Sequence, residues 1–444
     1  MVDFLKQVFG YLNEHTCYAV LRNFEGLPER NDSRDIDIAI ERKEYIRHRK
    51  ALVGIVEQAG WKVVTYLNSD RLITWVCGRV DDQGKADLVQ FDFFFHTSLY
   101  GLVLIENRDL LKHRRFNGEI YHVDHVYEFL DKYLYNRAVG AKYPDKYRAQ
   151  RERAEHDDAT NEGVRRAFGC GTVAECDAAS RGKLLRGLLW SNLKHYGPGL
   201  LWNYAKFEYH HVRNYVRSCT GFSVGFTGPD GSGKTTVIDM MIESLGDVFR
   251  KAHAYLHFRP TLFGNLGEVA HSAGMKKTVD RNYSDPHRGG RTGLVSGLVR
   301  LLYYSMDYVL GYFLRVKTVT RITRLVIFDR YYTDIICDSR RSRIYLPIGL
   351  LYWWGRLLIP SLDYNILLTA DSDTILLRKR ELDREDIDTI NQKIDFLATK
   401  PGYYKILNDG TPQEAVTRIL NIVFETQHRK NLKRLKATYF SLDR

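Results

Sequence analysis

The most constraining feature of the chain is the run GPDGSGKT at residues 228–235, which matches the pattern G-x-x-x-x-G-K-[ST] over its full length. The strand-like run FSVGFT precedes it, and the helix-like run TTVIDMMIESL follows it. Glycines in such a turn let successive N–H groups point at one anion, beside the positive end of the helix dipole. The sequence therefore predicts a phosphate-binding loop at the end of a strand.

Two side chains of this loop suit a nucleoside triphosphate bound with Mg²⁺. Lys234 is placed to reach the β- and γ-phosphates, and Thr235 offers a hydroxyl ligand to the metal. ATP and Mg²⁺ are therefore the expected cofactors, and phosphoryl transfer is the expected reaction; a loop that binds nucleotide without catalysis is the alternative. The residues expected to bind the nucleotide are Gly228, Asp230, Gly231, Ser232, Gly233, Lys234, Thr235 and Thr236.

The run LVIFDRYYTDIICD supplies a second part of the same expected site. Asp329 follows four apolar strand residues, so a parallel sheet would place its carboxylate at the same edge as the loop, where it can hold magnesium. Arg330 would bind an anionic group of the acceptor or the charge that develops during transfer. A surface ion pair between the two is the alternative.

A third part is a basic helical stretch after the strand-like run YNILLTA. In a nucleotide kinase this position supplies a closing lid whose arginines neutralise the charge in transfer, whereas a solvated helix face is the ordinary alternative. The arginines concerned are Arg378, Arg380 and Arg384. With Lys234, Asp329 and Arg330 they complete the expected catalytic set.

The first part of the chain carries a separate group of carboxylates. Asp35 and Asp37 alternate in RDIDIAI, so both project from one face of a strand, and Asp92 lies in another apolar strand, VQFDFFF. Three converging carboxylates suit a shared divalent cation. An exposed acidic strand edge is one alternative, and neutralisation by Arg22 and Arg34 is another.

The chain is expected to be α/β, with three segments. Residues 1–150 show short strands after an initial helix, 151–220 form a helical connector, and 221–444 alternate strands with helices, which predicts a parallel sheet with helices on both faces.

GPDGSGKTT, the DRYY at 329–332 and the arginines of the lid resemble thymidylate-kinase-like P-loop kinases over roughly residues 221–428. The resemblance implies that Asp230 helps to place the acceptor, that Lys234 and Thr235 bind the donor, and that the Asp-Arg pair binds magnesium and acceptor phosphate. The sequence HFRPTLFG replaces the family's REPGGT, and the segment from Thr261 to Arg324 is long. These departures resemble a divergent bacterial branch associated with surface polysaccharides, so the acceptor is a dTMP-like nucleotide or a glycan-related molecule.

Residues 15–150 resemble the minimal nucleotidyltransferase fold, which implies a metal at Asp35, Asp37 and Asp92. LRNFEGLP at 21–28 stands where that superfamily has a Gly-Ser turn. The resemblance predicts the fold and leaves nucleotidyltransferase activity open.

The net charge of +12 favours an anionic partner. Basic residues are spread along the chain and form no tail, so nucleic acid is the less favoured partner, as is a nucleic-acid-processing nucleotidyltransferase. A nucleotide-binding regulatory protein without turnover is the main alternative function. The N-terminus lacks an export signal, which favours the cytoplasm, while aromatic and basic helices leave peripheral membrane contact open, and a homodimer is a further alternative.

Overall fold

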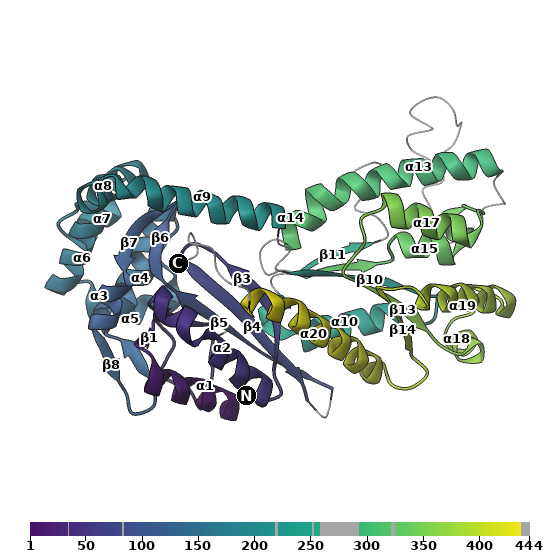
Figure 1. The fold of residues 1–444 in the computed structure, drawn as a ribbon, viewed down its shortest axis with the longest axis horizontal. Helices are drawn as coiled ribbons and strands as arrows, with labels where there is room; N and C mark the ends of the chain where they lie inside the picture. The colour runs from purple at the N-terminus through teal and green to yellow at the C-terminus, as the bar shows by residue number, and fades with distance from the viewer. Residues whose placement is uncertain are drawn as a thin grey trace. The chain divides into compact units, whose positions relative to one another are not determined.

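The computed structural model describes residues 1–33, 35–81, 84–217, 221–250, 253–257, 293–320 and 325–436 (Figure 1). The chain packs as two compact units. The first contains Met1–Arg79, Asp87–Ser218 and the chain from Phe424 onward; the second contains Val80–Ala86 and Cys219–Val423. The predicted boundaries at residues 150 and 220 remain a prediction.

A mixed sheet of seven strands, in the order β3-β4-β5-β2-β1-β9-β8, forms the centre of the first unit. Its strands are β1 (Tyr18–Val20), β2 (Asp35–Ile40), β3 (Lys62–Asn68), β4 (Leu72–Val80), β5 (Ala86–Phe94), β8 (Arg114–Phe116) and β9 (Tyr121–Val123). β2 and β5 are parallel neighbours inside the sheet, with Asp37 opposite Asp92. The acidic residues therefore do not lie on a sheet edge, and that alternative is wrong.

Helices and a small hairpin complete this unit. On α1 (Val2–His15), buried apolar residues recur at helical spacing, and Phe4 stacks on Trp61 with ring centroids 4.5 Å apart. The other elements up to residue 139 are α2 (Arg42–Gln58), β6 (His96–Leu99), β7 (Leu102–Glu106), α3 (Asn107–Lys112) and α4 (His125–Val139). The predicted connector is helical and packs with the first unit. It contains η1 (Asp145–Tyr147), α5 (Arg148–Ala154), α6 (Asp158–Phe168), α7 (Val173–Ala178), α8 (Arg181–Tyr196) and α9 (Gly199–Arg217).

The second unit is built on a parallel sheet of five strands in the order β11-β12-β10-β13-β14. The strands are β10 (Phe222–Thr227), β11 (His253–His257), β12 (Leu325–Asp329), β13 (Tyr364–Thr369) and β14 (Tyr403–Leu407). Their buried, apolar sequences are typical of a parallel sheet covered on both faces. Figure 1 shows α13, α15 and α17 on one side of the sheet and α10 and α20 on the other. The predicted α/β fold with a parallel sheet between helices is confirmed.

The helices of the second unit connect these strands in the order expected for such a fold. They are α10 (Lys234–Ser244), α11 (Gly246–Arg250), α13 (Leu294–Gly311), η2 (Tyr312–Val316), α14 (Lys317–Thr320), α15 (Tyr332–Cys337), α16 (Ser339–Ser342), α17 (Ile348–Leu358), α18 (Ser372–Arg378) and α19 (Arg384–Ala398). The last helix, α20 (Pro412–Lys436), belongs to the second unit as far as Val423 and to the first from Phe424. One continuous helix is therefore shared by both units.

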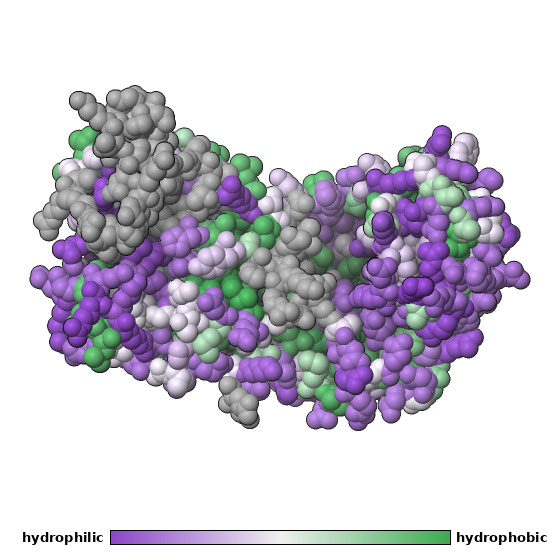
Figure 2. Space-filling view, turned by 180° about the vertical axis from the view of Figure 1, so that it is seen from behind, coloured by the Kyte–Doolittle hydropathy of each residue, from purple (hydrophilic) through white to green (hydrophobic). Residues whose placement is uncertain are grey.

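Two helices of the second unit carry unusually many exposed apolar side chains. These are Leu294, Val295, Leu298, Val299, Leu302 and Met306 on α13, and Leu350, Trp353, Leu357 and Leu358 on α17. The face drawn in Figure 2 is largely hydrophilic, with apolar residues in separate patches. Within the described ranges, every helix is too short or too polar to cross a bilayer.

Candidate active site and metal centre

The glycine-rich loop has the conformation that its sequence predicts. β10 ends at Thr227, and α10 begins at Lys234, with Gly233 as its N-cap at φ 87°. Gly231 has φ 90°, so both glycines adopt the left-handed conformation that other residues rarely take. A Cβ on Gly228 would lie 1.9 Å from the carbonyl oxygen of Leu368, so the loop packs too closely on β13 for any side chain there. The loop is therefore formed by closely packed backbone, as the predicted phosphate-binding loop requires.

Lys234 lies buried against this loop. Its Nζ donates to the carbonyl oxygens of Gly228 at 2.9 Å and Pro229 at 2.8 Å, and lies 4.0 Å from Oδ1 of Asp230. Burial and the neighbouring charge of Arg330 lower the pKa of Lys234 to about 7, against the opposing effect of Asp230. The amine is therefore held in a place where an anion would favour its charged form.

Asp230 connects the loop to two arginines. Its Oδ1 accepts a hydrogen bond from Arg330, and its Oδ2 accepts one from Arg341. Arg330 also donates to Oδ1 of Asp334 at 2.8 Å. Burial raises the pKa of Asp334, against the effect of Arg330. The result is a buried network of alternating charges directly beside the phosphate loop.

The backbone of Arg330 is constrained as well as its side chain. Its φ is 73°, in the left-handed region that non-glycine residues avoid at a cost of about 1 kcal/mol. Its N–H donates to the carbonyl oxygen of Phe226 at 2.9 Å, next to the loop. The guanidinium that follows this turn contacts Asp230 of the loop and Asp334 of α15.

Asp329 ends β12 at the same edge of the sheet. Its Oδ2 accepts a hydrogen bond of 3.0 Å from the hydroxyl of Tyr255 and lies 3.9 Å from Nε2 of His257. Its Oδ1 is buried and has no hydrogen-bond partner in the described part of the chain. An orphaned carboxylate oxygen next to a phosphate loop fits a metal ligand. Thr235 and Thr236 are exposed at the first turn of α10, so the hydroxyl of Thr235 is accessible for the same ion.

The predicted lid differs from one continuous basic helix. α18 ends at Arg378, and α19 begins at Arg384 because the side chain of Asp383 accepts the N–H of Asp386 and caps a new helix. Nη1 of Arg378 donates to the carbonyl oxygen of Asn408 at 2.9 Å. The amide of Asn408 in turn donates to the carbonyl oxygen of Ser232 at 2.8 Å, so Arg378 is linked to the loop.

The other two arginines of the predicted lid, Arg380 and Arg384, are exposed to solvent. Arg384 forms an ion pair with Asp373 at 2.8 Å, and this pair leaves it outside the loop network. Arg380 has no ion pair among the described residues. A lid role for these two residues remains a prediction.

In the first unit the three carboxylates meet as the alternation of β2 and β5 predicts. Asp35, Asp37 and Asp92 can each supply an oxygen such that all lie within 4.8 Å of one another. Asp37 and Asp92 are buried; Asp92 accepts hydrogen bonds from the hydroxyl of Thr74 and the amide of Gln90. Burial raises the pKa of Asp37 to about 7, with Arg22 opposing and the other carboxylates adding to the shift. The donor set fits a hard divalent cation.

Arg22 is the competing neutraliser of this cluster. It forms ion pairs with Asp37 at 2.8 Å and with Asp131 at 2.7 Å, so only part of its charge faces the cluster. Burial raises the pKa of Asp92 too, and the charge of Asp35 adds to this shift while Arg22 opposes it. Arg34, the other neutraliser considered, lies outside the described residues.

Several residues of both sites were not found from the sequence. Asp334 and Arg341 follow Arg330 at four and eleven positions, a spacing without any known pattern, and Asn408 and Asp131 come from distant elements. Buried polar residues in apolar runs, such as Asp334 in YTDIIC, were the available signal. Residues 258–292, which include Arg259 in HFRP and part of the long segment that begins at Thr261, lie outside the described residues.

Comparisons with known proteins add little to this geometry. No protein-family model matches the chain, and no curated protein matches it. Among solved structures, a thymidylate kinase from Ehrlichia chaffeensis is 16% identical, with a TM-score of 0.30, over 46% of this chain and 98% of the other. A TM-score this low does not establish a common fold. The second unit is classed as a P-loop α/β fold on its own parallel sheet and its strand, loop and helix.

Proposed function

We propose that the second unit is an ATP- and Mg²⁺-dependent phosphotransferase of the thymidylate-kinase-like class. Its acceptor is a dTMP-like nucleotide or a glycan-related molecule. The observation that carries the proposal is the buried amine of Lys234 in a glycine loop, within the electrostatic reach of Asp329. Asp329 keeps an unpartnered buried oxygen among the described residues. A bound Mg²⁺ would give this oxygen a partner.

In this proposal the chain acts mainly by positioning and by charge. Lys234 exchanges the carbonyl oxygens of Gly228 and Pro229 for phosphate oxygens, and Arg330 stabilises the negative charge on the transferred group. Asp329 and Thr235 would hold Mg²⁺, which when bound neutralises the phosphate oxygens. Asp230 orients both arginines toward the acceptor.

The test is acceptor-dependent ADP release by the full chain with ATP and MgCl₂. Acceptors range from nucleoside monophosphates to sugars and sugar phosphates, and product is detected by transfer of labelled phosphate. Lys234→Ala should abolish transfer, whereas Arg418→Gln, an exposed arginine on α20, should not change it. Nucleotide binding with no turnover on any acceptor would favour the regulatory alternative.

A second candidate function concerns the first unit, because its three carboxylates meet at ligand distance. We propose that they bind a divalent cation and that this site supports nucleotidyl transfer. Incubation of the full chain with Mg²⁺ and each nucleoside triphosphate should release pyrophosphate if the site is active. Release that survives Lys234→Ala but not Asp37→Ala would assign it to this unit.

The exposed surface of the second unit bears on two candidate partners, anionic lipid and nucleic acid. Exposed apolar residues on α13 and α17 occur with Arg300 and Arg315, which favours peripheral contact with anionic lipid. Sedimentation with phosphatidylglycerol vesicles, compared with phosphatidylcholine vesicles, tests this, and equal recovery would reject it. Nucleic acid remains the less favoured partner; binding that weakens steeply with salt would reverse that order.

A further inference from the structure

A cavity of about 320 Å³ in the second unit is not explained by the phosphate site. It opens where β13 and β14 begin, near Asn365 and Tyr403. In the sheet register, Gly225 of β10 pairs with Asn365, whereas the phosphate loop follows the far end of β10. The residues that line the cavity do not include the loop at 228–235, although Tyr331, Tyr332 and Thr333, which follow Arg330, are among them. The volume of the cavity is that of a small-molecule site.

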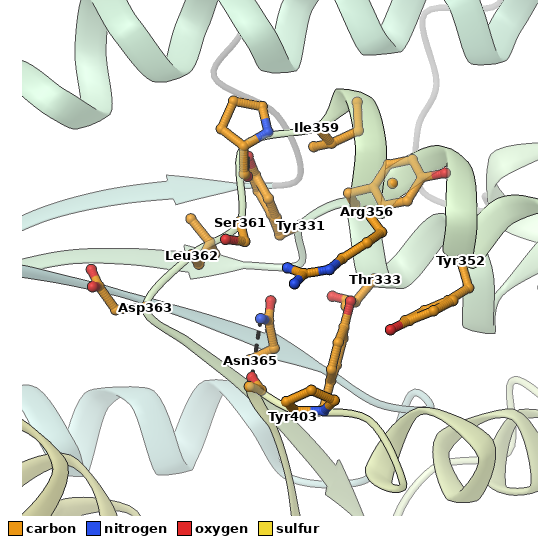
Figure 3. A pocket seen from close by; sticks show the side chains of 15 residues that line it. Tyr331, Thr333, Tyr352, Arg356, Ile359, Ser361, Leu362, Asp363, Asn365 and Tyr403 are labelled. Atoms are coloured by element: carbon orange, nitrogen blue, oxygen red, sulfur yellow. Dashed lines mark hydrogen bonds between the residues drawn. The ribbon is translucent and has the colours of Figure 1, made fainter.

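Arg356 of α17 is the principal charged group that points into this cavity (Figure 3). It forms no hydrogen bond or ion pair with any other described residue. The hydroxyl groups of Tyr352, Tyr403 and Ser361 also line the cavity and have no hydrogen-bond partner in the described part of the protein. A guanidinium and three hydroxyls are thus gathered around one space without partners of their own.

The charge of the cavity is positive on balance. Lys400 does not line the cavity, but its Nζ lies 5.6 Å from the ring centre of Tyr352, which does. Asp363 is the acidic lining residue, and its Oδ2 accepts hydrogen bonds from the N–H of Ser223 at 2.9 Å and its hydroxyl at 3.0 Å. Burial, together with the neighbouring Tyr352, raises the pKa of Tyr403 to about 12, so this phenol is a donor at neutral pH. Every unpartnered group named above can therefore donate to an anion.

The remaining walls are aromatic and apolar. Tyr331, Tyr332 and Ile359 are buried, and the hydroxyls of the two tyrosines are already used, donating to the carbonyl oxygens of Pro360 and Leu351 at 2.8 Å each. These rings present faces and edges, not polar groups, to the cavity. Such walls suit a ring carried next to the charged group of a ligand.

We propose that this cavity is a second ligand site, distinct from the phosphate loop, for a small ring compound that carries one phosphate or carboxylate group. Arg356 binds the oxyanion in a charge-assisted, two-point contact, supported by the hydroxyls of Tyr352 and Tyr403. The ring packs on the aromatic wall. The proposal does not depend on what the phosphate loop transfers.

The test uses phenyl phosphate and benzoate as probes, with benzyl alcohol as the uncharged control, in calorimetric titrations of the full chain. Saturable binding of at least one anion is expected, and none of the alcohol. The two anions distinguish a phosphate from a carboxylate preference. Arg356→Gln should weaken binding by about 10-fold or more, Arg356→Lys by less, and Tyr403→Phe by a few-fold.

Two further variants separate this site from others. Arg418→Gln removes an exposed arginine outside the cavity and should leave the affinity unchanged. Lys234→Ala disrupts the phosphate loop and should also leave it unchanged, whatever the outcome for transfer. Because Arg356 is exposed and without described partners, its glutamine variant should unfold at the parental temperature. Equal affinity in Arg356→Gln and parent, or no saturable binding up to about 10 mM, would overturn the proposal.

Discussion

Replacing Lys234 by methionine should stabilise the ligand-free protein while removing its response to nucleotide. The pKa of this buried amine is lowered from 10.5 to about 7, mainly by burial. That difference corresponds to about 5 kcal/mol of stability lost when the folded chain carries the charged amine. The hydrogen bonds to Gly228 and Pro229, lost in the variant, offset about 3 kcal/mol. A net gain of about 2 kcal/mol remains.

The sign of the pH effect follows from the direction of the shift. Between pH 7 and 10.5 the unfolded chain binds more protons at Lys234 than the folded chain, so the parent gains stability as pH rises through this window. The advantage of Lys234→Met is therefore largest at pH 7 or below and decreases toward pH 10. Bound triphosphate would favour the charged amine, so nucleotide binding should take up a proton above pH 7 and weaken as pH rises.

The assay is thermal unfolding, followed by differential scanning fluorimetry at pH 7 and 9, with and without Mg²⁺ and ATP. A gain of about 2 kcal/mol shifts the midpoint by about 4 to 8 °C for a unit of this size. ATP should raise the midpoint of the parent and not of the variant. A lower midpoint for ligand-free Lys234→Met, or an undiminished ATP shift, would refute the reasoning about the buried amine.

Three other changes probe the remaining parts of the two sites. Asp329→Asn should reduce turnover by about 100-fold or more with little loss of ATP affinity, because the carboxylate serves the metal and not the adenosine; equal losses in a nucleotide titration and a rate assay would indicate a structural aspartate. Arg341→Lys should raise the acceptor KM by about 10-fold, since an ammonium cannot reproduce the planar contact with Asp230. An unchanged KM would mean that Arg341 has a structural role only. Asp37→Ala should abolish the Mn²⁺ binding of the first unit, measured by calorimetry of the full chain, whereas Asp32→Ala, which replaces an exposed acidic residue nearby, should not. An unchanged isotherm for Asp37→Ala would contradict the metal site.

Local patterns in the sequence predicted the parts of both sites that depend on neighbouring residues. The loop from Gly228 to Thr235 was recognisable because its glycine spacing, strand and helix all lie within one short segment. The meeting of Asp37 with Asp92 required one further step, since strand alternation fixes the face and parallel pairing brings the two strands together. In both cases the backbone geometry determines where the functional groups lie.

The missed residues depend on packing between distant segments. Arg341 of α16 contacts Asp230 across 111 positions of sequence, and Asn408 contacts Ser232 from just after the end of β14. The break between α18 and α19 was missed because residues 372–398 have a nearly continuous helical composition, and only the Asp383 cap separates the two helices. Such contacts are decided by tertiary structure, which overrides local propensity.

The arrangement of charges beside the loop bears on the acceptor. Arg330 and Arg341 each contact two carboxylates, those of Asp334 and Asp338 in addition to the shared Asp230. An acceptor phosphate that bound both guanidiniums would therefore have to compete with several buried aspartates for them. A neutral acceptor rich in hydroxyl groups meets no such competition, because its hydroxyls can donate to carboxylates and accept from guanidiniums in the same network. On the proposed phosphotransferase function, we infer from this balance that a glycan-related acceptor binds better than a dTMP-like nucleotide. If nucleoside monophosphates prove better acceptors than sugars by kcat/KM, the network must open on binding and this reasoning is wrong.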